Sequence, residues 1–258
     1  MTDAQDGQQS TSGGVQSIRR AFELLETLAE SGPMTLSQLS ANSGLPLTTI
    51  HRLTGTLVGL GYLRQHSAKQ YALGPRLIHL GERASRLFAT WAAPHLTRLV
   101  ETLGETANLA MLDGDEIVYV AQAPSRHSMR MFTEVGRRVP AHCTAVGKAL
   151  IAQLAAEEVE GIVLRRGMPA QTENTITTPE QLADELDAVR RQGFAIDDGE
   201  QEIGVHCVAV ALAEGTPRLA VSISGPVPRM NDDLVRRAVP VLNRTARDLA
   251  VDLAVDRG

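Results

Sequence analysis

The chain has 258 residues, of which 43% are hydrophobic and 21% are charged, and its formal net charge is -5. This length predicts one or two domains with ordinary buried cores. The sequence has no apolar run long enough to span a membrane and no signal-peptide core near its start, so we expect a cytoplasmic protein rather than a membrane or secreted one.

Cysteine and lysine usage narrow the class of protein further. Cys143 and Cys207 are the only cysteines, which are too few for a disulfide framework and fit a reducing compartment. Lys69 and Lys148 are the only lysines among 25 cationic residues, so the chain strongly favours arginine. We attribute this preference to codon usage in a GC-rich genome rather than to nucleic-acid binding. The acidic balance argues against a global polyanion binder but allows a small basic module on an acidic body.

The first part of the chain predicts a polar tail followed by two helices. Residues 1–14 offer almost nothing to bury, which predicts a disordered tail. A helix then begins with Ser17 as its cap and ends at the Ser-Gly-Pro sequence at 31–33. Thr35 and Gln38 have the spacing of a capping box and predict a short second helix. The expected apolar stripe of the first helix consists of Ile18, Phe22, Leu25, Leu28 and Ala29.

Pro46 predicts the start of a third helix that runs to about Leu60. Its apolar stripe consists of Ile50, Leu53, Leu57 and Leu60. A solvated helix face usually carries Glu and Lys pairs, whereas the opposite face here has small hydroxyl residues, one arginine, one histidine and two glycines. Such side chains can donate to phosphates and base edges, and small residues permit close approach, so this face is predicted to enter a DNA groove.

Two short strands, 62–65 and 70–73, are predicted after the third helix, and this hairpin is basic. Three helices followed by a basic hairpin indicate a winged helix-turn-helix over residues 15–75. Residues 13–82 carry a net charge of +2 although the whole chain is at -5, so positive charge is concentrated here. A helical hairpin packed as ordinary core is the alternative. The predicted DNA contacts are Gln16, Ser17, Arg19, Thr35, Thr48, Thr49, His51, Arg52, Arg64 and Lys69.

The remainder of the chain predicts a linker and a second domain. Residues 76–90 form a helical stripe, expected either to pair subunits or to cap the winged module. From 91 to 254, hairpins interleave with helices, which favours an α+β domain over a parallel doubly wound one. The expected elements are helices at Trp91–Leu103 and Thr144–Leu154, helices beginning near Thr178 and Asn231, and hairpins over 106–121 and 207–224.

Spaced motifs in both halves resemble the IclR-type bacterial transcriptional regulators. The motifs are Val15–Ile18, Ser43–Leu53, Leu60–Leu63, His142–Ala149, Asp197–Glu202, Gly204–Cys207 and Ser222–Pro226. The resemblance covers about Gly13 to Leu253. It implies a dimer or a dimer of dimers, in which each subunit joins a winged helix-turn-helix to a GAF/PAS-like domain that senses a small molecule.

The resemblance also implies an effector site. In the family the effector is often a small carboxylate held by a helix N-terminus, an aspartate, a cysteine and two serines. The matching positions are Thr144, Ala145 and Val146 at the helix start, with Asp197, Cys207, Ser222 and Ser224. Ala145 stands where some glyoxylate- or pyruvate-binding members have glycine, so a tighter pocket or a different ligand is expected.

The chemistry of these residues limits the ligand. A cap at Thr144 leaves the next three amides free to bind an anion, and Ser222 and Ser224 alternate onto one side of a strand as donors. Asp197 repels an anion unless the ligand also offers a donor, so we expect a carboxylate at one end and a donor at the other. On the residues alone, the preferred interpretation is that the serines satisfy neighbouring backbone and Asp197 caps a turn.

Metal and enzyme alternatives are weaker. Adjacent residues on a strand face opposite ways, so His142–Cys143 and His206–Cys207 each supply one ligand at most, and no metal or other cofactor is expected. Gly147–Lys148 lacks both the earlier glycine and the following Ser/Thr of a phosphate loop. A Cys-dependent hydrolase with an unrelated helical N-terminal module remains the alternative class, although no nucleophile-elbow sequence is present.

The sequence therefore predicts a regulator that binds double-stranded operator DNA, that is not an enzyme, and that we expect to act as a repressor. The effector is narrowed to a small polar carboxylate, with glyoxylate, pyruvate, ureides and aromatic acids all open. A constitutive DNA binder with a vestigial pocket is a second alternative within regulation.

Overall fold

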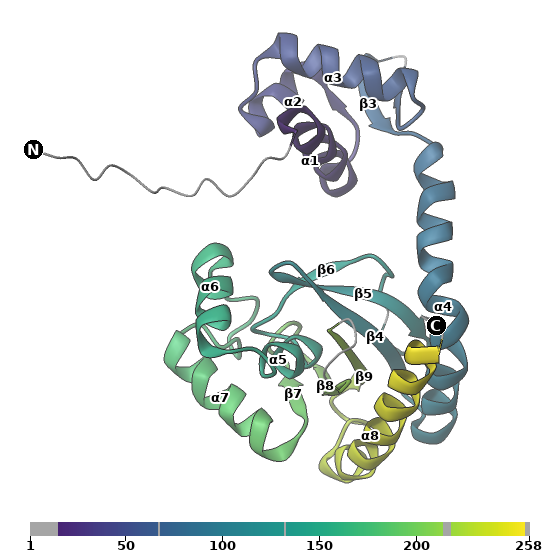
Figure 1. Ribbon diagram of the computed structural model, residues 1–258, viewed down its shortest axis with the longest axis vertical. Coiled ribbons are helices and arrows are strands. Elements are labelled where there is room, and N and C mark those ends of the chain that lie inside the picture. The colour runs from purple at the N-terminus through teal and green to yellow at the C-terminus, as the bar shows by residue number, and fades with distance from the viewer. Residues whose placement is uncertain (1–14, 67, 132, 214–217, 256–258) are drawn as a thin grey trace, which may run out of the picture. The chain divides into compact units, whose positions relative to one another are not determined.

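The computed structural model describes residues 15–66, 68–131, 133–213 and 218–255 (Figure 1). Its contacts divide the chain into two compact units, the first ending at Arg83 and the second beginning at Ala84. The tail predicted over residues 1–14 and the turn at 214–217 lie outside the described residues. No helix in the described part of the chain is long and apolar enough to cross a membrane.

The first unit consists of three helices and a small antiparallel sheet. Its elements are α1 (Gln16–Ser31), β1 (Met34–Thr35), α2 (Leu36–Ser43), α3 (Leu47–Gly59), β2 (Leu63–Gln65) and β3 (Gln70–Leu73), with the strands in the order β1-β3-β2. The capping box is present, because the Thr35 hydroxyl accepts from the Gln38 amide and the Gln38 side chain accepts from the Thr35 amide. The predicted winged helix-turn-helix is therefore confirmed, with the β2–β3 hairpin as its wing.

Helix α1 differs from the prediction at its start and along its apolar stripe. Val15 is at the N-cap and no side chain caps the helix, so the predicted cap at Ser17 is wrong. Ile18 and Phe22 were expected in the core but are 57% and 60% exposed, whereas Leu24 is fully buried. Helical spacing identifies candidate stripes, but the position of the neighbouring elements decides which stripe is covered.

Helix α4 (Arg76–Leu103) is continuous across the boundary between the two units. The helical stretches expected at 76–90 and at Trp91–Leu103 are therefore parts of one helix. No glycine or proline lies where the two stretches join, so nothing ends the helix there. Pro94 removes one backbone donor yet lies inside the helix.

The second unit is built on one six-stranded antiparallel sheet in the order β6-β5-β4-β9-β8-β7. Its strands are β4 (Thr106–Asp113), β5 (Glu116–Ala123), β6 (Arg138–Pro140), β7 (Ala195–Asp198), β8 (Val205–Ala211) and β9 (Leu219–Pro226). Strands β4 and β5 form the hairpin predicted at the Asp-Gly-Asp turn, with Asp113 opposite Glu116. The α+β architecture is therefore confirmed.

Helices cover both faces of this sheet (Figure 1). On one face, α4 and α8 (Asp232–Val255) pack into a core with the central strands. On the other face, α5 (Ala145–Ile151), α6 (Ala156–Arg166) and α7 (Pro179–Gln192) form a second core. Helix α5 ends before the predicted Leu154 and packs against β7, β8 and β9. The predicted effector residues lie on this second face.

Candidate functional site

The residues predicted to contact DNA all belong to the first unit, and most of them are on its surface. On α3, the side chains of Thr48, His51 and Arg52 are exposed and Thr49 is half-buried. The other exposed positions are Gln16, Ser17 and Arg19 in the first turn of α1, Arg64 on β2 and Lys69 in the turn of the wing. Thr35 is half-buried and its hydroxyl is engaged in the capping box, so it offers less to a phosphate than the others.

Helix α3 is held in place by its opposite side. Ile50 is fully buried and Leu57 is 7% exposed, in keeping with the predicted stripe, whereas Leu60 is 51% exposed because it lies at the C-cap. Thr54 is also fully buried, and its hydroxyl donates to the carbonyl of Ile50 at 2.9 Å. The core therefore orients α3 so that its polar face remains available.

The cations of this unit are free to meet phosphates. Arg19, Arg52, Arg64 and Lys69 form no ion pair within the described residues. Positive side chains without an acidic partner release counterions when they meet a nucleic-acid backbone, which is the dominant electrostatic contribution to DNA affinity. The unit therefore has the charge that the predicted interface requires.

An apolar hollow lies within the same unit, between α1, α3 and the first turns of α4. Its volume is about 560 Å³, and Ser17 and Arg52 lie on its border. Phe22, Leu60 and Leu80 line it and are each about half exposed or more. Exposed apolar surface that is gathered in one place is typical of a contact site.

Three of the predicted effector residues lie side by side across the sheet of the second unit. Asp197 on β7 is paired with Cys207 on β8, which is paired with Ser224 on β9. Ser222 lies two positions along β9 and faces the same side. Asp197 and Ser222 are each 2% exposed and Ser224 is 5% exposed. The fold thus gathers these polar side chains in a buried row on the α5 face.

The start of α5 supplies fewer free amides than predicted. The Thr144 hydroxyl caps the helix by accepting from the Gly147 amide at 3.2 Å, so only Ala145 and Val146 offer theirs to a ligand. The prediction that all three amides are free is therefore wrong. A Cβ atom on Gly147 would lie 2.2 Å from the carbonyl oxygen of Ala141, so only glycine fits at this position.

Asp197 caps a turn and has a raised pKa. Its Oδ1 accepts from the backbone amides of Glu200 at 2.8 Å and Gln201 at 3.4 Å, so it does cap the turn after β7. Burial raises the pKa of Asp197 to about 7, although these hydrogen bonds oppose the rise. Near neutral pH its carboxyl group is therefore partly protonated, and its protonated form can donate to an anionic ligand.

A buried ionic cluster beside this row escaped the sequence analysis. Lys148 on α5 is 1% exposed, and its Nζ contacts Oε1 of Glu200 and lies 2.8 Å from Oε1 of Glu185. Burial raises the pKa of Glu200, and Lys148 opposes that rise. Glu200 Oε2 is buried without a hydrogen-bond partner in the described part of the chain. Lys148 therefore links α5 to α7 and to the turn after β7 through ion pairs.

Two amide side chains continue the polar row onto the neighbouring strands. Asn108 on β4 is 1% exposed, and its Nδ2 donates to Ser224 Oγ at 3.2 Å. Gln122 on β5 is half-buried, and its Nε2 donates to Asn108 Oδ1 at 3.2 Å. Polar Thr106 and Asn108 alternate with apolar residues along the predicted strand, and this pattern is the signal that could have identified them.

Neither cysteine is activated as a nucleophile. Burial raises the pKa of the Cys143 thiol to about 12, and that thiol donates to Gln201 Oε1 at 3.0 Å. Burial also raises the pKa of the Cys207 thiol well above its usual range. A hydrolytic cysteine needs a thiolate near neutral pH, and both sites disfavour it.

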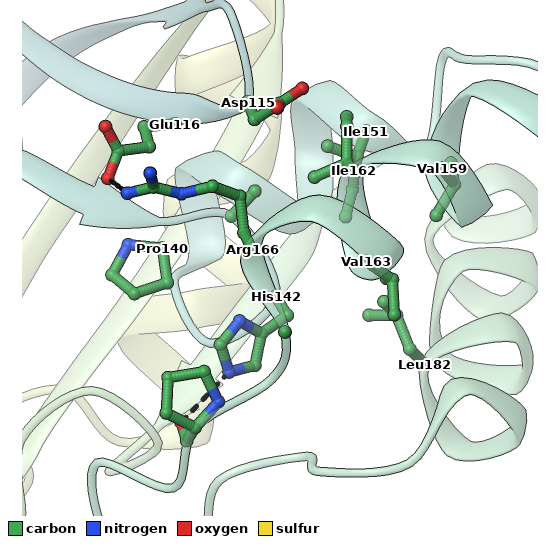
Figure 2. Close-up of a pocket in the computed structure, with 13 residues that line it drawn as sticks. Asp115, Glu116, Pro140, His142, Ile151, Val159, Ile162, Val163, Arg166 and Leu182 are labelled. Carbon is green, nitrogen blue, oxygen red and sulfur yellow. Dashed lines mark hydrogen bonds and ion pairs between the residues drawn. The ribbon is translucent and has the colours of Figure 1, made fainter.

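His142 lies apart from the effector row, in the turn before α5 rather than on the strand we assumed. His142 and residues of α6 line a second hollow of about 100 Å³, which Figure 2 shows. The Nε2 of His142 lies 3.3 Å from the carbonyl oxygen of Pro169. Arg166 and Glu116 form an ion pair at the edge of this hollow. His142 and its neighbour Cys143 thus have different partners. Within the described residues, no three potential metal-ligating side chains cluster.

Comparison with known proteins agrees with both units. The pattern described as the IclR helix-turn-helix domain matches residues 17–67, and that described as the bacterial transcriptional regulator IclR C-terminal matches residues 85–251. The chain is 35% identical over 247 residues to the transcriptional repressor IclR of Escherichia coli K12, covering 93% of this chain and 90% of that protein. It is 32% identical to the transcriptional repressor AllR of the same strain, covering 94% and 92%.

Solved structures are similar over the same span. An IclR homolog from Microbacterium hydrocarbonoxydans, crystallised with 4-hydroxybenzoate, superposes with a TM-score of 0.75 at 27% identity, covering 93% of this chain and 99% of that one. The relatives of the present protein are regulators rather than enzymes, and the first unit of this protein is a DNA-binding domain. The chain therefore belongs to the IclR family of bacterial transcriptional regulators.

Proposed function

We propose that this protein is a repressor whose affinity for its operator is set by a small carboxylate bound in the second unit. The observation that carries the proposal is the buried row of Asp197, Cys207 and Ser224 beside the first turn of α5. Polar side chains that converge in a buried row are typical of a ligand site, and the second oxygen of Asp197 is not used by the turn that its Oδ1 caps. Repression is supported by the names of the relatives IclR and AllR.

The ligand class follows from the donors in this site. The amides of Ala145 and Val146 and the hydroxyls of Ser222 and Ser224 can all donate to carboxylate oxygens. Asp197 can accept from a hydroxyl at the far end of the ligand, or donate when it is protonated. 4-Hydroxybenzoate, found with the Microbacterium homolog, has a carboxylate and a hydroxyl at opposite ends, in keeping with this chemistry. Hydrated glyoxylate and ureides also combine a carboxylate with a donor, whereas pyruvate offers a keto oxygen that meets Asp197 in its protonated form.

The DNA contacts are assigned to the polar face of α3 and to the cations around it. Thr48, Thr49, His51 and Arg52 would reach base edges or phosphates in a major groove. Gln16, Ser17, Arg19 and Thr35, with Arg64 and Lys69 on the wing, would contact the flanking backbone. Effector binding must favour one arrangement of the DNA-binding units over another, since a ligand with equal affinity for both arrangements shifts nothing.

We also propose that the protein acts as a homodimer or a dimer of dimers. Support comes from the apolar hollow of the first unit, where Ile18 and Phe22 are 57% and 60% exposed although they are large and apolar. A second copy of the same hollow would bury these side chains, because a two-fold interface pairs one surface with itself. Two-fold symmetry would then require an inverted-repeat operator.

Fluorescence anisotropy tests the DNA interface. On DNA from upstream of its own gene, at physiological salt, we expect Arg52→Ala to weaken specific binding about fivefold or more, since one base-contacting arginine contributes about 1–3 kcal/mol. Arg247→Ala is the matched control, because Arg247 is an exposed arginine on α8. Unchanged operator affinity in Arg52→Ala, measured against a scrambled duplex, would remove α3 from the interface. Titration with glyoxylate, pyruvate, allantoate and 4-hydroxybenzoate then tests whether an acid changes that affinity.

Sedimentation velocity tests the dimer. We expect Phe22→Glu to shift the protein toward smaller species, because a charge in the hollow cannot be buried against a second copy without a large desolvation cost. Leu164→Glu is the control, since Leu164 on α6 is 86% exposed and is not among the residues that line this hollow. Identical sedimentation of Phe22→Glu and the unmodified protein would place the subunit contact elsewhere.

A further inference from the structure

We infer that Asn108 and Gln122 are positioning residues that make Ser224 a fixed hydrogen-bond donor, so that this end of the site selects an acceptor oxygen over an N–H group. The inference rests on the proposed effector site and names two residues that the sequence did not assign to it. The ligand atom that meets Ser224 is a carboxylate oxygen.

The three side chains form a continuous chain across the middle of the sheet. Gln122 on β5 is paired with Asn108 on β4, and Asn108 is paired with Ser222 on β9, two positions from Ser224. The side chain of Asn108 thus lies on the face that carries both serines. Asn108 is 1% exposed and Ser224 is 5% exposed, so water cannot replace either partner at low cost.

The hydrogen bonds that link Gln122, Asn108 and Ser224 all run in the same direction. Gln122 Nε2 donates to Asn108 Oδ1, and Asn108 Nδ2 donates to Ser224 Oγ, each at 3.2 Å. The acceptor at Asn108 Oδ1 fixes its amide orientation, which presents an N–H group and not a carbonyl to Ser224. Hydrogen bonds that follow one another in a single direction polarise each other in a buried site.

A serine hydroxyl by itself is ambivalent, because it offers one donor and two acceptor lone pairs. Here one lone pair is taken by Asn108, so the hydroxyl proton turns away from β4. Cys207 is paired with Ser224 on the neighbouring strand, and its sulfur is only a weak acceptor, so an oxygen of the ligand is the better partner for this proton. The hydroxyl therefore suits a carboxylate oxygen and opposes an amide N–H at the same place.

Substitution of Asn108 separates positioning from direct contact. We expect Asn108→Ala to weaken binding of the tightest-bound acid among pyruvate, glyoxylate and 4-hydroxybenzoate by about tenfold in calorimetric titrations. The primary amide of that acid should lose less, so the preference for acid over amide narrows. Because Asn108 acts through Ser224, Asn108→Ala should add no further loss in a Ser224→Ala background. Gln122→Ala, at the more exposed end, should change the preference in the same direction by a smaller factor.

The control is Asn243→Ala, which removes an amide that donates to the Val239 carbonyl at 3.0 Å on α8, on the opposite face of the sheet. Full loss from Asn108→Ala in the Ser224→Ala background, or an unchanged preference for acid over amide, would overturn the inference. If no probe binds the unmodified protein, the proposed carboxylate effector is wrong. Thermal melting without ligand then still tests whether Asn108 and Ser224 are coupled through their hydrogen bond. The melting-temperature shifts of Asn108→Ala and Ser224→Ala should then be non-additive, and additive shifts would overturn the inference.

Discussion

Lys148→Met is expected to lower the free energy of unfolding by about 3–5 kcal/mol at pH 8, because it leaves a buried carboxylate without its cation. Lys148 is 1% exposed and contacts Glu200 and Glu185, and Glu200 is itself 7% exposed. Methionine has a similar length, so the lost packing is small and the missing charge dominates the effect. Urea denaturation at fixed pH measures the change.

The pH dependence of this loss has a definite sign. Burial already raises the pKa of Glu200, and Lys148 opposes that rise, so removal of Lys148 raises the pKa further. A carboxyl group with a raised pKa takes up a proton as the pH falls, and a neutral carboxyl costs far less to bury. We therefore expect Lys148→Met to lose less stability at pH 5 than at pH 8.

Two further variants make this result interpretable. Glu200→Gln in the Lys148→Met background removes the orphaned charge and should recover about half of the loss or more at pH 8. Lys69→Met is the matched control, since Lys69 is the only other lysine and is exposed at the tip of the wing. A loss that is equal at pH 5 and pH 8, with no recovery from Glu200→Gln, would mean that packing and not charge explains the role of Lys148.

Local signals in the sequence predicted the elements that depend on local physics. The capping box at Thr35, the proline before α3 and the Asp-Gly-Asp turn between β4 and β5 each act within a few residues. Their geometry is set by backbone hydrogen bonding and allowed dihedral angles, which neighbouring side chains determine. These elements were therefore predicted close to their observed positions.

Contacts between residues far apart in the sequence could not be predicted from these local signals. Lys148 meets Glu185 and Glu200, which are 37 and 52 residues away, and Asn108 meets Ser224, which is 116 residues away. Spacing along the chain says nothing about which strands become neighbours, so the Asp197, Cys207 and Ser224 row came from the family resemblance alone. The exposure of Ile18 and Phe22 was missed for the same reason, because burial depends on what packs against a helix.

Asp197→Asn is expected to become more stable relative to the unmodified protein as the pH rises from 4 to 8. The pKa of Asp197 is raised from 3.8 to about 7 by burial. Above pH 3.8 the unfolded chain loses this proton while the folded chain keeps it, so the contribution of Asp197 to stability falls until about pH 7 and then stays constant. Asparagine has no such proton and retains an oxygen for the Glu200 and Gln201 amides. The relative gain should reach about 4 kcal/mol.

The protonation of Asp197 should also make ligand binding depend on pH. Pyruvate offers no donor to an ionised Asp197, so its dissociation constant is expected to rise by up to about tenfold per pH unit above neutrality. In Asp197→Asn the dissociation constant should be nearly independent of pH, whereas Asp198→Asn, at the exposed neighbouring position, should behave like the unmodified protein. Calorimetry in buffers of different ionisation enthalpy counts the proton taken up. A dissociation constant that does not vary with pH in the unmodified protein would mean that the ligand meets Asp197 in its ionised form and supplies the donor itself.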